Sequence, residues 1–198
     1  MNLLNWQKTK RMIKPKNFLD YFYKRQSDRS YDNRPIETEK LDRILEAARL
    51  APSASNAQPW KFIVVNEPAL KNKIADCTAS RTLGINHFTK QAPIHIVIVE
   101  EKANFNSNAG SLIKKKHFPF IDIGIAAEHI CLQATVEGLG SCMIGWFDES
   151  RVKKLLNIPR KKRVPLIITL GYPDKETREK RRKSKDEIIS YNRYSSSN

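Results

Sequence analysis

The feature that most constrains the fold of this chain is a segment, residues 121–140, that is apolar almost all round. It reads IDIGIAAEHICLQATVEGLG, and Ile121 and Ile130 would lie on opposite sides of a helix. A surface helix shows one polar face, whereas a helix that is apolar on every side is buried. Gly138 and Gly140 are typical of residues that end a helix. The segment therefore predicts a core helix with other elements packed around it.

Four short apolar runs predict the strands of a single sheet. One of them, PIHIVIVEE, is apolar on both faces, which indicates a strand in the interior of the sheet. Helical and strand patterns are mixed along the whole chain, which predicts an α+β fold, and residues 1–198 are expected to form one domain. The predicted strands are KFIVV (61–65), PIHIVIVEE (93–101), SCMIGWF (141–147) and VPLIITLGYP (164–173).

Further segments have the periodicity of helices. Thr38 and Asp148 are candidate N-caps for two of them, because a short polar side chain before an apolar stripe accepts from the first free N–H groups. The predicted helices are NFLDYFYKRQS (17–27), TEKLDRILEAARLA (38–51), PALKNKIADCTA (68–79) and DESRVKKLLNI (148–158).

The positive charge of the chain is gathered at its two ends. Residues 1–34 contain nine basic and three acidic side chains, and residues 149–198 contain fifteen and six. Residues 35–148 contain twelve of each, and the formal net charge of the whole chain is +15. The basic ends can be solvated surface, or they can meet around an anion, either nucleic acid or a phosphorylated cofactor. Composition alone leaves both interpretations open.

Most of the usual catalytic and metal-binding motifs are absent from the sequence. Its four histidines lack metal-ligand spacing, no GxSxG motif occurs, and GLGS follows a predicted helix rather than a strand. Cys142 is only a weak candidate nucleophile, because nothing marks a basic partner for it. We therefore expect no metal and no catalytic side chain, as in flavin enzymes that leave the chemistry to the cofactor.

The cysteines, the apolar runs and the N-terminal pattern favour one cellular compartment. Three cysteines without CxxC spacing suggest reduced thiols, no apolar run approaches the ~20 residues that cross a bilayer, and the N-terminus has no signal-peptide pattern. We expect a cytoplasmic protein with no membrane partner. Residues 1–16 are interpreted as an N-terminal extension and residues 101–118 as a flap or binding loop. The tail, residues 174–198, carries apolar side chains that need a surface, and a partner subunit is the natural one.

Four motifs in order carry a resemblance to a known family. They are KRQSDRSYDNRPI, ARLAPSASNAQPWKFIVV, GLGSCMIGWFDESRVKKLLNIP and LIITLGYPD followed by KRRKSKDEI. Together they resemble the nitroreductase family of FMN-dependent flavoproteins, from about residue 17 to the C-terminus. The resemblance implies a central, mostly antiparallel sheet flanked by helices, in an intertwined homodimer with FMN at the subunit interface. It also implies that NAD(P)H delivers a hydride to flavin N5, from which it passes to an acceptor.

The resemblance assigns the phosphate end of FMN to both basic ends of the chain. Arg25, Ser27 and Arg29 match an early Arg-x-Ser-x-Arg/Lys pattern that holds the FMN phosphate and ribityl chain, and Gln26 is implied to touch the cofactor. In the tail, Arg182 and then Lys180 match a second phosphate-binding cluster, in a register uncertain by one or two positions. Guanidinium forks and a hydroxyl suit a phosphate dianion.

Two further motifs are implied to contact the flavin ring. Ser53 and Asn56 lie in the loop PSASNAQPW, which in the family crosses to the partner's flavin and bonds its polar edge. An Asn amide offers both a donor and an acceptor to that edge. Met143, Ile144 and Gly145 match the strand against the ring, with a backbone N–H toward N5. These expectations lead to an NAD(P)H-dependent FMN oxidoreductase with a ping-pong mechanism and a nitroaromatic, quinone or enone acceptor.

Two alternatives remain open. A flavin-binding relative with flavin-destructive or dehalogenating chemistry would share the same motifs. A basic nucleic-acid-binding module is the alternative from another class, although no helix-turn-helix, RNA-recognition or zinc pattern accompanies the charge. We therefore expect no nucleic-acid partner.

Overall fold

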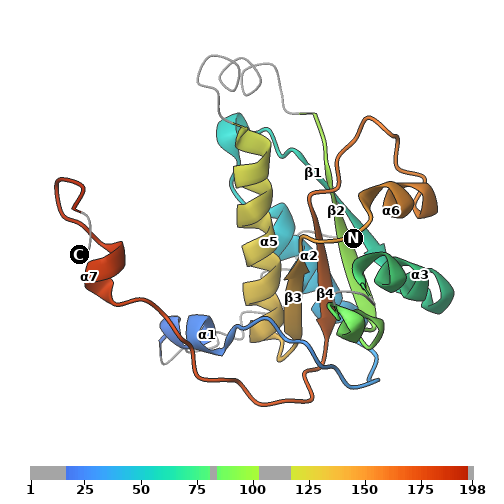
Figure 1. Cartoon of the computed structure of the whole chain (residues 1–198), viewed down its shortest axis with the longest axis horizontal. Coiled ribbons are helices and arrows are strands. Elements are labelled where there is room, and N and C mark those ends of the chain that lie inside the picture. The colour runs from blue at the N-terminus through green and yellow to red at the C-terminus, as the bar shows by residue number, and fades with distance from the viewer. Residues whose placement is uncertain (1–16, 81–83, 103–116, 196–198) are drawn as a thin grey trace, which may run out of the picture.

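A four-stranded sheet lies at the centre of the computed structural model, which describes residues 17–80, 84–102 and 117–195. Every neighbouring pair of its strands is antiparallel, so the predicted antiparallel sheet is confirmed. The predicted extension at residues 1–16 and most of the predicted flap lie outside the described residues. In spatial order the strands are β1 (Trp60–Val65), β2 (Ile94–Glu100), β4 (Leu166–Gly171) and β3 (Gly140–Ile144) (Figure 1).

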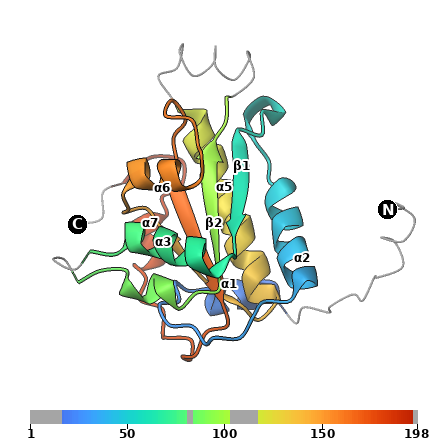
Figure 2. The same ribbon diagram turned by 90° about the vertical axis from the view of Figure 1, so that its right-hand side faces the viewer.

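Helices cover both faces of this sheet. Figure 2 shows α2 and α5 on one side of the strands and α3 and α6 on the other. Among the described residues, no helix has the length and apolar character needed to cross a membrane. The helices are α1 (Leu19–Lys24), α2 (Thr38–Arg49), α3 (Pro68–Thr78), α5 (Phe118–Val136), α6 (Glu149–Leu155) and α7 (Lys185–Ile188), with 3₁₀ turns η2 (Ala54–Asn56) and η3 (His87–Lys90).

Strand β2 organises the core because it is buried on both faces. Ile96 and Ile98 pack with α2 and α5, whereas Val97 and Val99 pack with α3 and α6. Each fully buried aliphatic side chain stabilises the fold by roughly 1.5–3 kcal/mol. The continuous apolar run that predicted an interior strand therefore reflects two layers of helices. Cys77, Cys131 and Cys142 are free, as the sequence predicts, and all three are buried.

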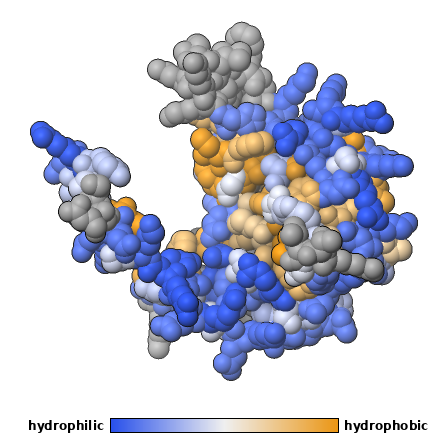
Figure 3. Space-filling view, viewed as in Figure 1, coloured by the Kyte–Doolittle hydropathy of each residue, from blue (hydrophilic) through white to orange (hydrophobic). Residues whose placement is uncertain are grey.

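Helix α5 is not covered on every side, so that part of the prediction is wrong for the single chain. Ile130 and Ala134 are fully buried against the sheet and α2, but Phe120 is 44% exposed and Ile121 is 55% exposed. Within one chain, the sheet and α2 reach only one side of the helix. Figure 3 shows an apolar surface over the same end of α5.

The start of α2 differs from the prediction, whereas the start of α6 confirms it. Thr38 is the first helical residue, and the N-cap is Glu37, whose side chain caps nothing. Asp148 caps α6 by accepting from the Arg151 backbone N–H at 3.0 Å. The Glu37 side chain instead makes a tertiary contact, which the local sequence pattern could not predict.

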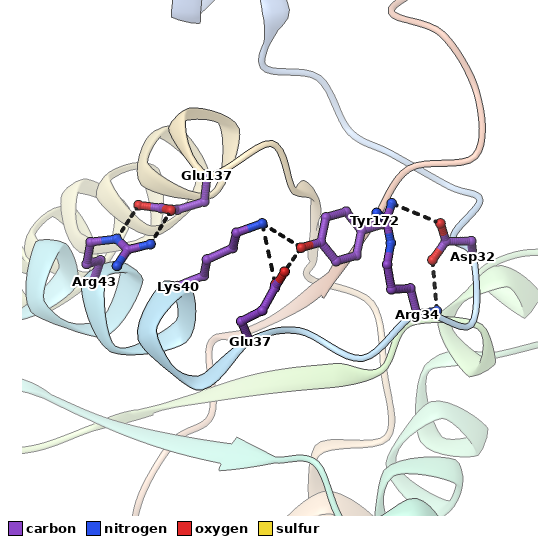
Figure 4. A network of polar contacts seen from close by, with 7 residues as sticks. All are labelled: Asp32, Arg34, Glu37, Lys40, Arg43, Glu137 and Tyr172. Atoms are coloured by element: carbon purple, nitrogen blue, oxygen red, sulfur yellow. Dashed lines mark hydrogen bonds and ion pairs between the residues drawn. The ribbon is translucent and has the colours of Figure 1, made fainter. Parts of the chain in front are cut away.

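That contact belongs to a polar network around Tyr172, which follows β4 (Figure 4). The Tyr172 hydroxyl donates to Glu37 at 2.5 Å and accepts from Lys40 at 2.5 Å. The guanidinium of Arg34 lies 3.5 Å from the centre of the Tyr172 ring. The hydrogen bond from Tyr172, and then Lys40, lowers the pKa of Glu37. The network ties the start of α2 and the preceding loop to the end of the central sheet.

We predict that His95 makes the fold sensitive to acid. Its side chain is fully buried on β2, and burial, assisted by the charge of Lys71, lowers its pKa from 6.5 to about 4. Because the folded-state pKa is the lower one, the unfolded chain takes up the proton first as the pH falls. The contribution of His95 to the free energy of unfolding is therefore fully present above pH 6.5. It is lost as the pH falls toward 4, by on the order of 3 kcal/mol.

Urea unfolding of His95→Leu at pH 7 and pH 4.5 tests this prediction. The variant should lose less unfolding free energy between the two pH values than the parent chain, whereas His87→Leu, at an exposed position, should behave like the parent. Parallel acid dependence in all three proteins would contradict the prediction.

Candidate functional site

The segment Arg25–Arg29 is held against the free edge of β3. Ser27 pairs with Ser141 in an isolated parallel bridge, and the Asp28 N–H donates to the Ser141 carbonyl at 2.9 Å. A Cβ at Gly140 would lie 2.7 Å from the Asp28 carboxylate, so a side chain cannot be accommodated there without a shift. Gly140, the second glycine of the GLGS motif, therefore allows this close approach.

The C-terminal tail docks on the same segment. Gln26 accepts a hydrogen bond from the Arg178 backbone N–H at 3.1 Å, and the Arg178 guanidinium donates to the Ser27 carbonyl at 3.1 Å. The Lys180 ammonium donates to the Arg25 carbonyl. Two segments about 150 residues apart in sequence thus lie side by side.

A cavity of about 560 Å³ opens between these two segments, and we call it the arginine pocket. Arg29 and Arg182 form no ion pair with any described residue, whereas Arg25 pairs with Glu128 at 3.6 Å. Partial burial, followed by the charges of Arg25 and Arg182, lowers the pKa of Lys180. The lining residues are Arg25, Gln26, Ser27, Arg29, Arg178, Glu179, Lys180, Arg181 and Arg182. The two basic ends of the chain therefore meet around a cavity suited to an anion.

A second cavity of about 580 Å³ adjoins the first, because Arg29 lines both, and we call it the strand pocket. The end of β3 forms one wall, where a Cβ at Gly145 would meet nothing within 4 Å. Burial raises the pKa of the Cys142 thiol, which argues against a nucleophilic cysteine. The lining residues are Arg29, Gly84, Ile85, Asn86, His87, Phe88, Cys142, Met143, Ile144, Gly145 and Trp146.

The sequence reasoning missed several of these lining residues. Arg178 is the cation that joins the tail to Gln26, but nothing in a run of basic residues distinguishes it. Asn86 has a φ of 59° and donates to the Thr78 carbonyl at 3.1 Å, and an Asn before a short turn was the available signal. Trp146 is half exposed beside Gly145, and no local pattern distinguishes it.

The structure does not bring Ser53 and Asn56 to either pocket of the same chain. Their turn, η2, lies at the N-terminal end of α5, whereas α1 and the docked tail lie near the other end of this helix (Figure 1). Ser53 Oγ accepts from the Gln58 backbone N–H at 2.9 Å, and the Asn56 amide oxygen accepts from the Gln58 side chain at 3.1 Å. Asn56 does not cap α2, which ends at Arg49.

No group of three potential metal-ligating side chains occurs among the described residues. The model of the family described as "Nitroreductase family" matches residues 23–172. The chain belongs to the nitroreductase family. The matched range holds the segment Arg25–Arg29, all four strands and η2, and the docked tail follows it.

Three relatives in this family show how far the similarity extends. A protein of Archaeoglobus fulgidus with the provisional name NADH dehydrogenase/NAD(P)H nitroreductase is 34% identical, over 80% of this chain and 86% of its own. An FMN-dependent nitroreductase of Clostridium difficile has a solved structure with a TM-score of 0.74 and 33% identity, over 89% of this chain and 99% of that chain. Human iodotyrosine deiodinase 1 is 27% identical, over 91% of this chain and 70% of its own.

Proposed function

We propose that this nitroreductase-family protein is an FMN-dependent oxidoreductase that passes a hydride from NAD(P)H to an organic acceptor by a ping-pong mechanism. The acceptor would be a nitroaromatic, a quinone or an enone. The observation that carries the proposal is the pair of cavities joined at Arg29, one cationic and one walled by a strand. One flavin mononucleotide has a matching dianionic end and a flat ring. The C. difficile relative is named FMN-dependent, and relatives named NAD(P)H nitroreductases support the electron donor.

The arginine pocket fits the phosphate end of FMN. Arg29 and Arg182 have no carboxylate partner among the described residues, so an anion would supply one. Arg25 and Lys180 would add charge, and Ser27 belongs to the same lining. Charge-assisted hydrogen bonds of this kind are about twice as strong as neutral ones.

The strand pocket fits the ring. Among the described strands, β3 pairs with β4 alone, so beyond the bridge at Ser27 its other edge would present backbone N–H groups. Met143 and Ile144 would lie against the ring, and Gly145 leaves the approach open. When bound, the flavin would supply the hydride chemistry at N5. The chain's own residues would orient the ring and exclude water from it, so none is assigned as an acid or base.

A second chain would complete the site. Ser53 and Asn56 lie away from the pockets of their own chain, and apolar side chains of α5 are exposed beside them. Two apolar residues are also exposed on the projecting tail: Ile188, the last residue of α7, and Ile189, which follows it. We propose an intertwined homodimer in which the turn η2 covers the partner's flavin and the tail lies on the partner.

The reductive half-reaction tests the proposed function. The purified protein reconstituted with FMN should bleach anaerobically on addition of NADH or NADPH. Its yellow colour should then return with a nitroaromatic, quinone or enone acceptor. A protein that binds no flavin, or whose flavin neither nucleotide reduces, would contradict the proposal.

Dehalogenation is a second candidate because human iodotyrosine deiodinase 1 matches 91% of this chain. Release of iodide from iodotyrosine by the chemically reduced flavoprotein would favour it. Bleaching by NAD(P)H with turnover of nitroaromatics and no iodide release would favour the reductase.

We predict that Arg29→Ala weakens FMN binding about ten- to a hundredfold, because one charge-assisted contact is worth on the order of 1.5–3 kcal/mol. Fluorescence titration of the protein freed of flavin measures this affinity. Lys24→Ala removes the same charge from an exposed neighbour that lines neither pocket, and it should leave the affinity unchanged. Equal affinities in both variants would show that the arginine pocket does not hold the phosphate.

We also predict that truncation after Pro173 costs both association and flavin, since it removes Arg178 and the projecting apolar tail. Light scattering coupled to size-exclusion chromatography, with absorbance in the flavin band, measures both at once. A truncated protein that stays dimeric and yellow would refute this arrangement.

A further inference from the structure

We propose that Asp122 is a positioning residue that fixes the backbone of the loop Ser53–Gln58. By fixing the loop, it would also position the loop's contact with flavin. The second part of this inference rests on the proposed function. Asp122 lies on α5 with only 4% of its surface exposed, and its Oδ1 accepts from the Ala54 backbone N–H at 3.1 Å. A side chain of the core helix therefore holds the first residue of the turn η2.

The loop needs such an anchor because its backbone is strained. Ser55, Asn56 and Gln58 have φ values of 52°, 50° and 47°, in the left-handed region that non-glycine residues rarely adopt. Hydrogen bonds from the Asn56 and Gln58 N–H groups to Ser53 close the loop on itself. They do not tie the loop to the core. Strained backbone of this kind persists only where the surrounding structure holds it.

A buried carboxylate is unfavourable at this position, and its hydrogen bond to the loop accounts for its presence. Asp122 Oδ2 is buried and has no hydrogen-bond partner among the described residues. Its neighbours Ile123 and Ala126 on α5 are buried apolar residues, among which an acid is unfavourable. An apolar residue would suit the core better, but it could not accept the Ala54 N–H. Packing alone therefore does not account for an aspartate at 122.

Two variants remove the same hydrogen bond from opposite sides. Asp122→Ala removes the acceptor. Ala54→Pro removes the donor and leaves the carboxylate in place, and proline suits the first position of a helical turn. Ser53, with φ −146° and ψ 155°, is already extended, as a residue before proline must be. Asp122→Asn keeps an acceptor oxygen and should therefore retain the hydrogen bond from the Ala54 N–H. Ile130→Ala is the matched control, since Ile130 is fully buried on the same helix but belongs to the core cluster.

Hydrogen exchange of residues 55–58 in the flavin-free protein measures the anchor. Exchange should rise about tenfold in Asp122→Ala and Ala54→Pro, rise no further in the double variant, and stay near the parent value in Asp122→Asn and Ile130→Ala. The midpoint potential and the reduction rate of bound FMN measure the consequence. Both should shift in the first two variants and not in the Ile130→Ala control.

Each outcome decides one part of the inference. Unchanged loop exchange in Ala54→Pro overturns the anchor, and this variant carries the test if Asp122→Ala fails to fold. Faster exchange with an unchanged potential and reduction rate overturns the role toward flavin while the proposed function stands. A parent protein without reducible flavin refutes the proposed function and the flavin part together, and the exchange data then decide the anchor alone.

Discussion

The convergence of two cationic segments is the constraint on which the candidate site depends. Partial burial, and then the nearby charges of Arg25 and Arg182, lower the pKa of Lys180. Like charges at this separation repel, so other contacts must hold the segments together. The Arg25 and Ser27 carbonyls supply these contacts by accepting hydrogen bonds from the tail. Backbone dipoles thus offset part of the repulsion, and the remaining positive potential faces the cavity.

The free edge of β3 has two uses in this arrangement. An unpaired strand edge is open to association with other chains unless it is covered. Ser27 covers its first part, which brings Arg25–Arg29 into position, and Gly140 makes that approach possible. The next residues, Met143–Gly145, are left to line the strand pocket. One edge of β3 therefore connects the arginine pocket to the strand pocket.

The strands could be predicted closely from the sequence, and the site only in part. The runs 61–65 and 93–101 match β1 and β2 to within a residue at every end. For β2 the reason is that a continuous apolar pattern follows burial between two helical layers. Residue patterns could not show that one side of α5 is exposed. The same apolar side chain is compatible with cover from its own chain or from another.

The site residues divide in a similar way. Arg25 and Arg182 were found because a resemblance and a charge pattern both marked them, and the structure places both in one pocket. Their role toward FMN stays a prediction. Asn86 and Arg178 were missed because tertiary packing, rather than any local pattern, brings them to the cavities. Asp122 was missed because an aspartate in an apolar helix gives no sign of the loop that it contacts.

The lining of the strand pocket is consistent with the proposal that no side chain acts as a dedicated acid or base. Three groups of the strand pocket could in principle move a proton: the Cys142 thiol, the Arg29 guanidinium and the His87 imidazole. Burial raises the pKa of Cys142, and a guanidinium does not give up its proton in a protein. His87 is exposed, so any proton it handles is shared with solvent. A reaction in which a cofactor carries the electron pair and solvent supplies the proton needs nothing more from this cavity than shape and charge.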